Sequence, residues 1–175
     1  MKRLALKWEL IGIAAISVLG SLLHFVFELS GELAPVGIFA AVNESVFEHL
    51  KLTYWPTLVY AACTYRIIRN SSNNFIIAKT AGIYVMPLSI IVLFYAYTII
   101  TGTEILIVDI LIFIVAVALG QLTSYKLLTM NRLPNSLHWI ALSLLVALAV
   151  IYGVFTFYPP QVPFFQDPVS DTYGI

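Results

Sequence analysis

Hydrophobic residues fill five stretches of this chain almost without interruption, at residues 8–27, 52–68, 80–100, 105–125 and 137–158. A helix needs about 20 consecutive apolar residues to cross the hydrocarbon core of a bilayer. The stretches lack the period-two alternation of membrane β-strands, and a helix satisfies its own backbone polar groups in lipid. The pattern therefore predicts an all-α, polytopic membrane helix bundle with five transmembrane helices, of which 52–68 is the weakest.

Two segments outside these spans carry their own patterns. Residues 31–51 are broken by Pro35 and Gly37 and are amphipathic from about residue 39 onward. We expect an outer helix there that lies in the interface or re-enters the bundle. Residues 159–175 hold four of the eight prolines together with several aromatic residues. This Pro-rich C-terminal tail is either a lid over the outer face or a disordered segment.

Composition and charge agree with a single integral membrane domain over residues 1–175. The chain is 61% hydrophobic and 10% charged, with a net charge of zero, whereas soluble domains carry about 25% charged residues. This excludes a soluble globular enzyme, and the few scattered basic residues exclude a dedicated nucleic-acid binder. The lone Cys63 excludes an internal disulfide framework.

The basic residues also predict an orientation. With five spans, eight of the nine Lys and Arg residues fall on one side, which the positive-inside rule assigns to the cytoplasm. Residues 8–27 lack a clean small-x-small cleavage site, which favours a retained helix over a signal peptide. We expect a multi-pass protein of the cytoplasmic (plasma) membrane, with the lipid bilayer as its partner, the N-terminus inside and the C-terminus outside.

Ionisable residues at the outer end of the first span form the first candidate site. His24 and Glu28 follow Ser17, Gly20 and Ser21 at steps of three and four residues, so all five share one helix face. An ionisable group in the membrane is costly unless it is paired or solvated, so it is a functional candidate. The alternative is that His24 bonds to a neighbouring helix and Glu28 lies in the headgroup layer.

Asp109 is the second candidate, because it lies one turn inside the fourth span at a depth that matches His24. Small residues on its face indicate packing against other helices. The alternative is a buried carboxylate bonded to Tyr or Thr hydroxyls. We hypothesise that His24, Asp109 and the acidic segment that follows the first span converge in one cavity.

That segment supplies the third candidate. Glu44 and Glu48 are four residues apart and could hold a divalent cation or act as a paired acid and base. His49 points about 100° away from Glu48 on a helix, so it is not expected to bind the same ion as Glu48. The alternative is structural: Ser45 and Glu48 fit a capping box, and Glu48 and Lys51 fit an ion pair.

Several blocks of sequence resemble a known family. They are His24-Phe-Val-Phe-Glu28, the block from Val42 to Lys51 that contains Asn-Glu-Ser and Glu-His, Tyr158-Pro159-Pro160, and the Tyr173-Gly174-Ile175 ending. The chain resembles the small prokaryotic membrane proteins grouped as domain of unknown function 6512 over nearly its whole length. The resemblance implies a several-span membrane protein and supplies no activity.

Two classes of function remain open. In the first, the polar site is catalytic and uses a divalent metal or a proton relay on a lipid-like substrate at the outer face. Its catalytic candidates are His24, Glu28, Glu44, Glu48 and Asp109, and its candidate metal ligands are His24, Glu28, Glu44, Glu48 and His49. In the second, the protein is a non-catalytic binder of a small molecule or ion, or an accessory subunit of a membrane complex.

Overall fold

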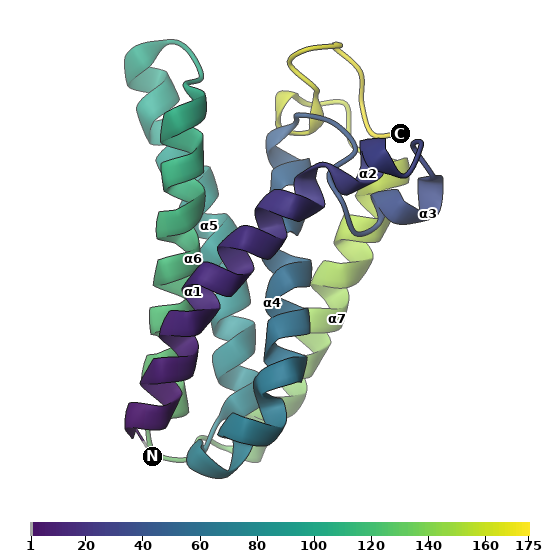
Figure 1. The fold of residues 1–175 in the computed structure, drawn as a ribbon. Coiled ribbons are helices and arrows are strands. Elements are labelled where there is room, and N and C mark those ends of the chain that lie inside the picture. The colour runs from purple at the N-terminus through teal and green to yellow at the C-terminus, as the bar shows by residue number, and fades with distance from the viewer. Residues whose placement is uncertain (1) are drawn as a thin grey trace.

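The computed structural model describes residues 2–175 as helices joined by loops (Figure 1). The long helices are α1 (Lys2–His24), α4 (Val46–Ile68), α5 (Phe75–Thr101), α6 (Leu106–Leu128) and α7 (Asn135–Phe157). The short elements are α2 (Val26–Leu29), α3 (Ala34–Gly37), and the 3-10 helices η1 (Arg69–Ser71) and η2 (Pro163–Phe165). Within the described range the β-structure is one isolated bridge between Gln166 and Tyr173, so the all-α fold class is confirmed.

The five long helices alternate in direction, so the two ends of the chain lie at opposite ends of the bundle (Figure 1). α5 and α6 form an antiparallel hairpin, α1 packs against α4 and α6, and α4 also packs against α5. α7 packs against α5 and α4 and buries few of its side chains. We call the end with α2, α3 and the C-terminus the tail end, and the end with the N-terminus the opposite end.

Four of the long helices, α1, α5, α6 and α7, are long and apolar enough to cross a membrane. They overlap four of the predicted spans, but the count of five spans is wrong. The predicted span 52–68 belongs to α4, which begins at Val46 and carries Glu48, His49 and Lys51 near its start. More than half of the α4 side chains are buried, so this helix lies among its neighbours, where polar residues are tolerated if they are paired.

The predicted amphipathic helix within residues 31–51 is also wrong as an independent element. α3 is a single turn, residues 38–45 are irregular, and the residues from Val46 onward form the start of α4. Ser45 is the N-cap of α4, and its Oγ accepts a hydrogen bond from the Glu48 N–H at 3.4 Å. The helix therefore starts where the capping alternative placed it.

The C-terminal tail is folded against the tail end of the bundle rather than extended away from it (Figure 1). Phe164 and Phe165 pack against the cluster of buried residues that contains Phe47 and Tyr152. The Ile175 N–H donates to the Thr156 carbonyl at 3.1 Å. The aromatic side chains of the tail and this hydrogen bond explain why a proline-rich segment with only one short 3-10 helix stays in place.

Glycine lets α1 approach its neighbours closely. The buried residues of α1 are Ala5, Glu9, Gly12, Ile16 and Gly20. This face contains Gly20 as predicted, but it excludes the exposed Ser21 and includes Gly12, which is not among the five residues predicted to share a face. A Cβ on Gly20 would lie 2.5 Å from the Leu52 carbonyl oxygen of α4 and 2.6 Å from the Phe113 ring.

Gly20→Val is expected to lower the free energy of unfolding by about 1–3 kcal/mol, because the added side chain forces α1 away from α4. Ala14→Val is the matched control, since Ala14 lies on the exposed face of the same helix. Thermal unfolding in detergent, followed by circular dichroism, measures the difference. Equal melting temperatures for the two variants would contradict the close α1–α4 contact.

Candidate metal centre at the tail end

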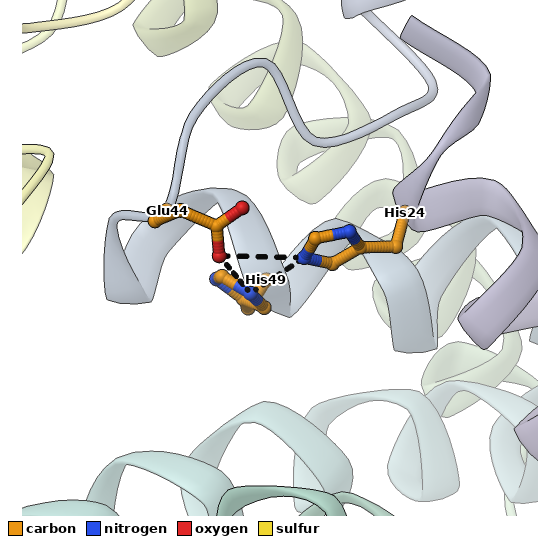
Figure 2. A group of neighbouring side chains, drawn as sticks. All are labelled: His24, Glu44 and His49. Atoms are coloured by element: carbon orange, nitrogen blue, oxygen red, sulfur yellow. Dashed lines mark hydrogen bonds and ion pairs between the residues drawn. The ribbon is translucent and has the colours of Figure 1, made fainter. Parts of the chain in front are cut away.

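Three side chains converge at the tail end, two from histidines and one from a glutamate (Figure 2). The Nε2 atoms of His24 and His49 are 3.1 Å apart. One carboxylate oxygen of Glu44 lies 3.5 Å from the His24 Nε2 and 3.4 Å from the His49 Nε2. Three atoms that can each donate a lone pair therefore point at one spot.

Each of these side chains lies at or near the end of a helix. His24 is the last residue of α1, where the helix dipole favours a positive charge. Glu44 immediately precedes Ser45, the residue that caps α4, and His49 lies in the first turns of that helix. The cluster thus joins the end of α1 to the start of α4.

Hydrogen bonds in the surrounding structure orient these ligand atoms. The Nδ1 of His49 is 2.9 Å from the Ser45 carbonyl oxygen, which can only accept, so Nδ1 carries the proton. In the neutral ring this leaves the Nε2 lone pair free toward Glu44 and His24. Metal-binding histidines in proteins are fixed in the same way, by a hydrogen bond on the nitrogen that does not bind the metal.

The spacing of the three atoms matches a tetrahedral metal site. Ligands about 2.1 Å from a zinc ion at tetrahedral angles are about 3.4 Å from one another, close to the 3.1, 3.4 and 3.5 Å observed. Lone pairs at these distances repel unless a proton or a cation lies between them. Two histidines and one glutamate are also the three protein ligands of one class of catalytic zinc site.

The charges of the cluster favour a bound cation. Hydrogen bonds from His24 and His49 hold the pKa of Glu44 well below its usual range and outweigh the effect of burial, so this carboxylate is ionised at neutral pH. Burial alone would lower the pKa of His49, but the hydrogen bonds to Glu44 and Ser45 and the charges of Glu44 and Glu48 raise it. When both imidazoles are neutral, the cluster carries the negative charge of Glu44, which attracts either a proton or a metal ion.

Glu48 does not join this cluster. Its carboxylate forms an ion pair with the ammonium of Lys51, and both side chains are almost completely buried. Glu48 also accepts a hydrogen bond from the Val42 N–H at 3.0 Å. The structural alternative for Glu48 is what the structure shows: the helix cap and the ion pair with Lys51 are both present.

Lys51 links three elements of the tail end, α3, α4 and α7. Beyond Glu48, its Nζ donates to the Gly37 carbonyl in α3 at 2.7 Å and to the Thr156 Oγ1 in α7 at 2.9 Å. The sequence suggested the Glu48–Lys51 pair but contained no sign of the other two contacts, because they join segments far apart in the chain. This network holds in place the loop that carries Glu44.

Asp109 and Glu28 also lie outside the three-residue cluster. The Asp109 carboxylate accepts a hydrogen bond from the Tyr97 hydroxyl at 2.6 Å, as in the alternative that paired it with a hydroxyl. The predicted convergence of His24 with Asp109 is therefore replaced by convergence of His24 with Glu44 and His49. Glu28 is exposed on α2 and lines the same cleft as His24 and Glu44.

This cleft is an open space of about 460 Å³ beside the cluster. Its walls combine acidic residues, Glu28 and Glu32, with the apolar side chains of Phe25, Val42 and Ile175. The side chains of His24 and Glu44, which line the cleft, are 26% and 49% exposed, so molecules that enter the cleft reach these two members of the cluster. The His49 side chain does not line the cleft and is 33% exposed.

Sequence reasoning missed two residues that bear on the site. The Asn43 side chain accepts from the Ser45 N–H at 3.0 Å and donates to the Gly174 carbonyl at 3.3 Å, which ties the Glu44 loop to the tail. An Asn two residues before an N-cap is a turn signal that could have identified Asn43.

The second residue is Glu104, in the loop between α5 and α6. Burial and the charge of Asp109 raise the pKa of Glu104, the charge of His49 lowers it, and the charge of Glu44 raises it.

The fold and the cluster define a class: an all-helical membrane protein with a group of potential metal ligands at one end. A family model described as "Family of unknown function (DUF6512)" matches residues 1–175, and the chain belongs to that family. No curated protein and no solved structure matches the chain. The resemblance noted in the sequence is confirmed, and the family's description assigns no activity.

Lys51→Met is expected to reduce the free energy of unfolding by about 3–5 kcal/mol, because it leaves the buried Glu48 carboxylate without a positively charged partner. The double variant Glu48→Gln with Lys51→Met should recover part of this loss, since no isolated charge remains. Thermal unfolding in detergent compares the two with the wild type. A single variant as stable as the wild type would show that the pair does not hold the tail end together.

Proposed function

We propose that His24, Glu44 and His49 bind a divalent metal ion, with Zn²⁺ the best match, and that the protein is a membrane metalloenzyme. The observation that carries the proposal is the approach of three lone-pair atoms to within 3.5 Å of one another. No cation other than a proton or a metal ion fits among atoms at that spacing.

The chemistry follows from the number of ligands. With three protein ligands, a bound zinc ion would have room for a water molecule and would supply a nucleophile near neutral pH by lowering the pKa of that water. His24, Glu44 and His49 would hold and orient the ion, and the cleft beside them would admit the substrate. We propose hydrolysis as the reaction class.

A lipid-like substrate is supported by the surroundings of the cleft. Phe25, which lines the cleft, and Leu29 and Leu33, which follow it in the segment after α1, are exposed large apolar side chains. Such side chains are stable in contact with acyl chains rather than water. A molecule with an apolar body and a polar reactive group would place its apolar body against these side chains and its reactive group at the metal.

We also propose that the tail end faces the outside of the plasma membrane. The positive-inside rule supports this orientation, because Lys2, Arg3 and Lys7 start α1 at the opposite end and Arg66 and Arg69 end α4 there. The site would then act on molecules at the outer surface.

A second candidate is a metal site with no catalytic role. It is favoured by the fact that the ligands come from the end of α1 and the start of α4, so a metal would cross-link two helices. A catalytic metal ion would have a fourth coordination position open to water or substrate, whereas a structural ion would not. In the Co²⁺-substituted protein, acetohydroxamate should change the visible absorption spectrum if that position is open, and an unchanged spectrum would favour the structural role.

Protein purified without chelator is expected to contain about one zinc ion per chain, as measured by inductively coupled plasma mass spectrometry. His24→Ala, Glu44→Ala and His49→Ala should each weaken Zn²⁺ binding at least about 100-fold in competition with a chromophoric chelator. Glu28→Ala and His138→Ala are matched controls and should bind as the wild type does. If the controls lost as much affinity as the cluster variants, or if no variant did, the metal site would be wrong.

A further inference from the structure

A second cavity, of about 240 Å³, lies at the opposite end of the bundle from the candidate metal centre. We call it the loop cavity. It lies where α4 ends, where α5 and α7 begin, and beside the loop between α6 and α7. Its basic lining residues are Arg69, Arg132 and His138, and its lining contains no acidic residue.

The two arginines are available to a ligand. The Arg69 guanidinium lies 5.6 Å from the centre of the Tyr65 ring, and Arg132 donates to the Asn135 Oδ1 at 3.4 Å. Among residues 2–175, the salt bridges involve other side chains, so neither guanidinium is neutralised by a carboxylate. Two uncompensated guanidinium groups at one cavity make it a site for an anion.

Backbone N–H groups add to this positive field. Phe75, Ile76 and Ile77, the first three residues of α5, all line the loop cavity. Asn74 precedes them, but its side chain does not cap α5. The first N–H groups of a helix that lack a cap carry partial positive charge and bind anions such as phosphate.

Hydrogen bonds between the walls of the loop cavity hold it in shape. The Asn74 amide donates to the carbonyls of Leu127 and Asn131 at 2.9 and 3.0 Å, and its oxygen accepts from the Leu133 N–H at 2.8 Å. Asn73 donates to the Met130 carbonyl at 3.0 Å. Because the Asn74 side chain makes these hydrogen bonds, it does not cap α5. The same bonds fix the α6–α7 loop against the start of α5.

We propose that the loop cavity binds a phosphate group through Arg69, Arg132 and the start of α5. A planar guanidinium matches two phosphate oxygens at once, and the volume admits a headgroup rather than a whole lipid. Leu142, one helical turn beyond His138 on α7, is exposed and would contact an acyl chain attached to that headgroup. Basic pockets between membrane helices bind anionic lipid headgroups in this way.

The phosphate has two sources, an anionic phospholipid or a free phosphate compound, and the experiment separates them. The full chain in detergent is mixed with dioleoylphosphatidylglycerol, with dioleoylglycerol, which lacks phosphate, or with glycerol 3-phosphate, and binding is measured by native mass spectrometry. The variants are Arg69→Gln and Arg132→Gln. Arg66→Gln is the matched control, because Arg66 is an exposed arginine near the end of α4 that does not line the cavity.

For a lipid ligand, phosphatidylglycerol should bind the wild type and Arg66→Gln alike and bind Arg69→Gln and Arg132→Gln at least about tenfold more weakly. For a free phosphate compound, glycerol 3-phosphate should show the same order of variants without lipid. Thermal unfolding verifies that each variant is folded. Equal losses in Arg66→Gln and the cavity variants, equal binding of dioleoylglycerol and phosphatidylglycerol, or no binding of either phosphate probe would overturn the proposal.

Discussion

The tail end of this protein depends on one buried ammonium group. The Lys51 Nζ has no exposure to solvent, and a charge in that position is stable only if every donor finds an acceptor. Its acceptors lie on α3, α4 and α7, so meeting this requirement fixes three elements relative to one another. α4 is less apolar than the four helices that are apolar enough to cross a membrane. The hydrogen bonds and the ion pair of Lys51 hold the start of this helix in the bundle.

The candidate metal centre lies at the edge of this network. Glu48, the partner of Lys51, also accepts from the Val42 N–H, and Asn43 bonds both Ser45 and the tail residue Gly174. Glu44 therefore lies between Asn43 and Ser45, which are both held by hydrogen bonds. Its carboxylate lies beside His49 from α4 and His24 from α1 (Figure 2). The sequence block from Val42 to Lys51 and the Tyr-Gly-Ile ending, which carry the family resemblance, are in direct contact in space.

Hydrophobic runs were sufficient to predict the all-α class and the four apolar helices, because lipid-facing helices must be apolar along their whole length. The hydrophobic runs also predicted a fifth transmembrane helix at residues 52–68, which is wrong. α4 is buried by other helices, so it does not have to be apolar along its whole length. Local spacing predicted the Ser45 cap and the Glu48–Lys51 pair, since both act within four residues. The pairing of His24 with Glu44 and His49 could not be ranked above Asp109, because it depends on how the loop folds back and no periodicity records that.

X-ray absorption at the zinc edge of the purified protein tests the metal centre most directly. The account predicts two imidazole nitrogens at about 2.0–2.1 Å and oxygen ligands at about 2.0–2.2 Å, with the imidazole signal lost when His24 and His49 are both replaced by Ala. A spectrum with sulfur or only oxygen ligands, or one that is unchanged in the double variant, would contradict it.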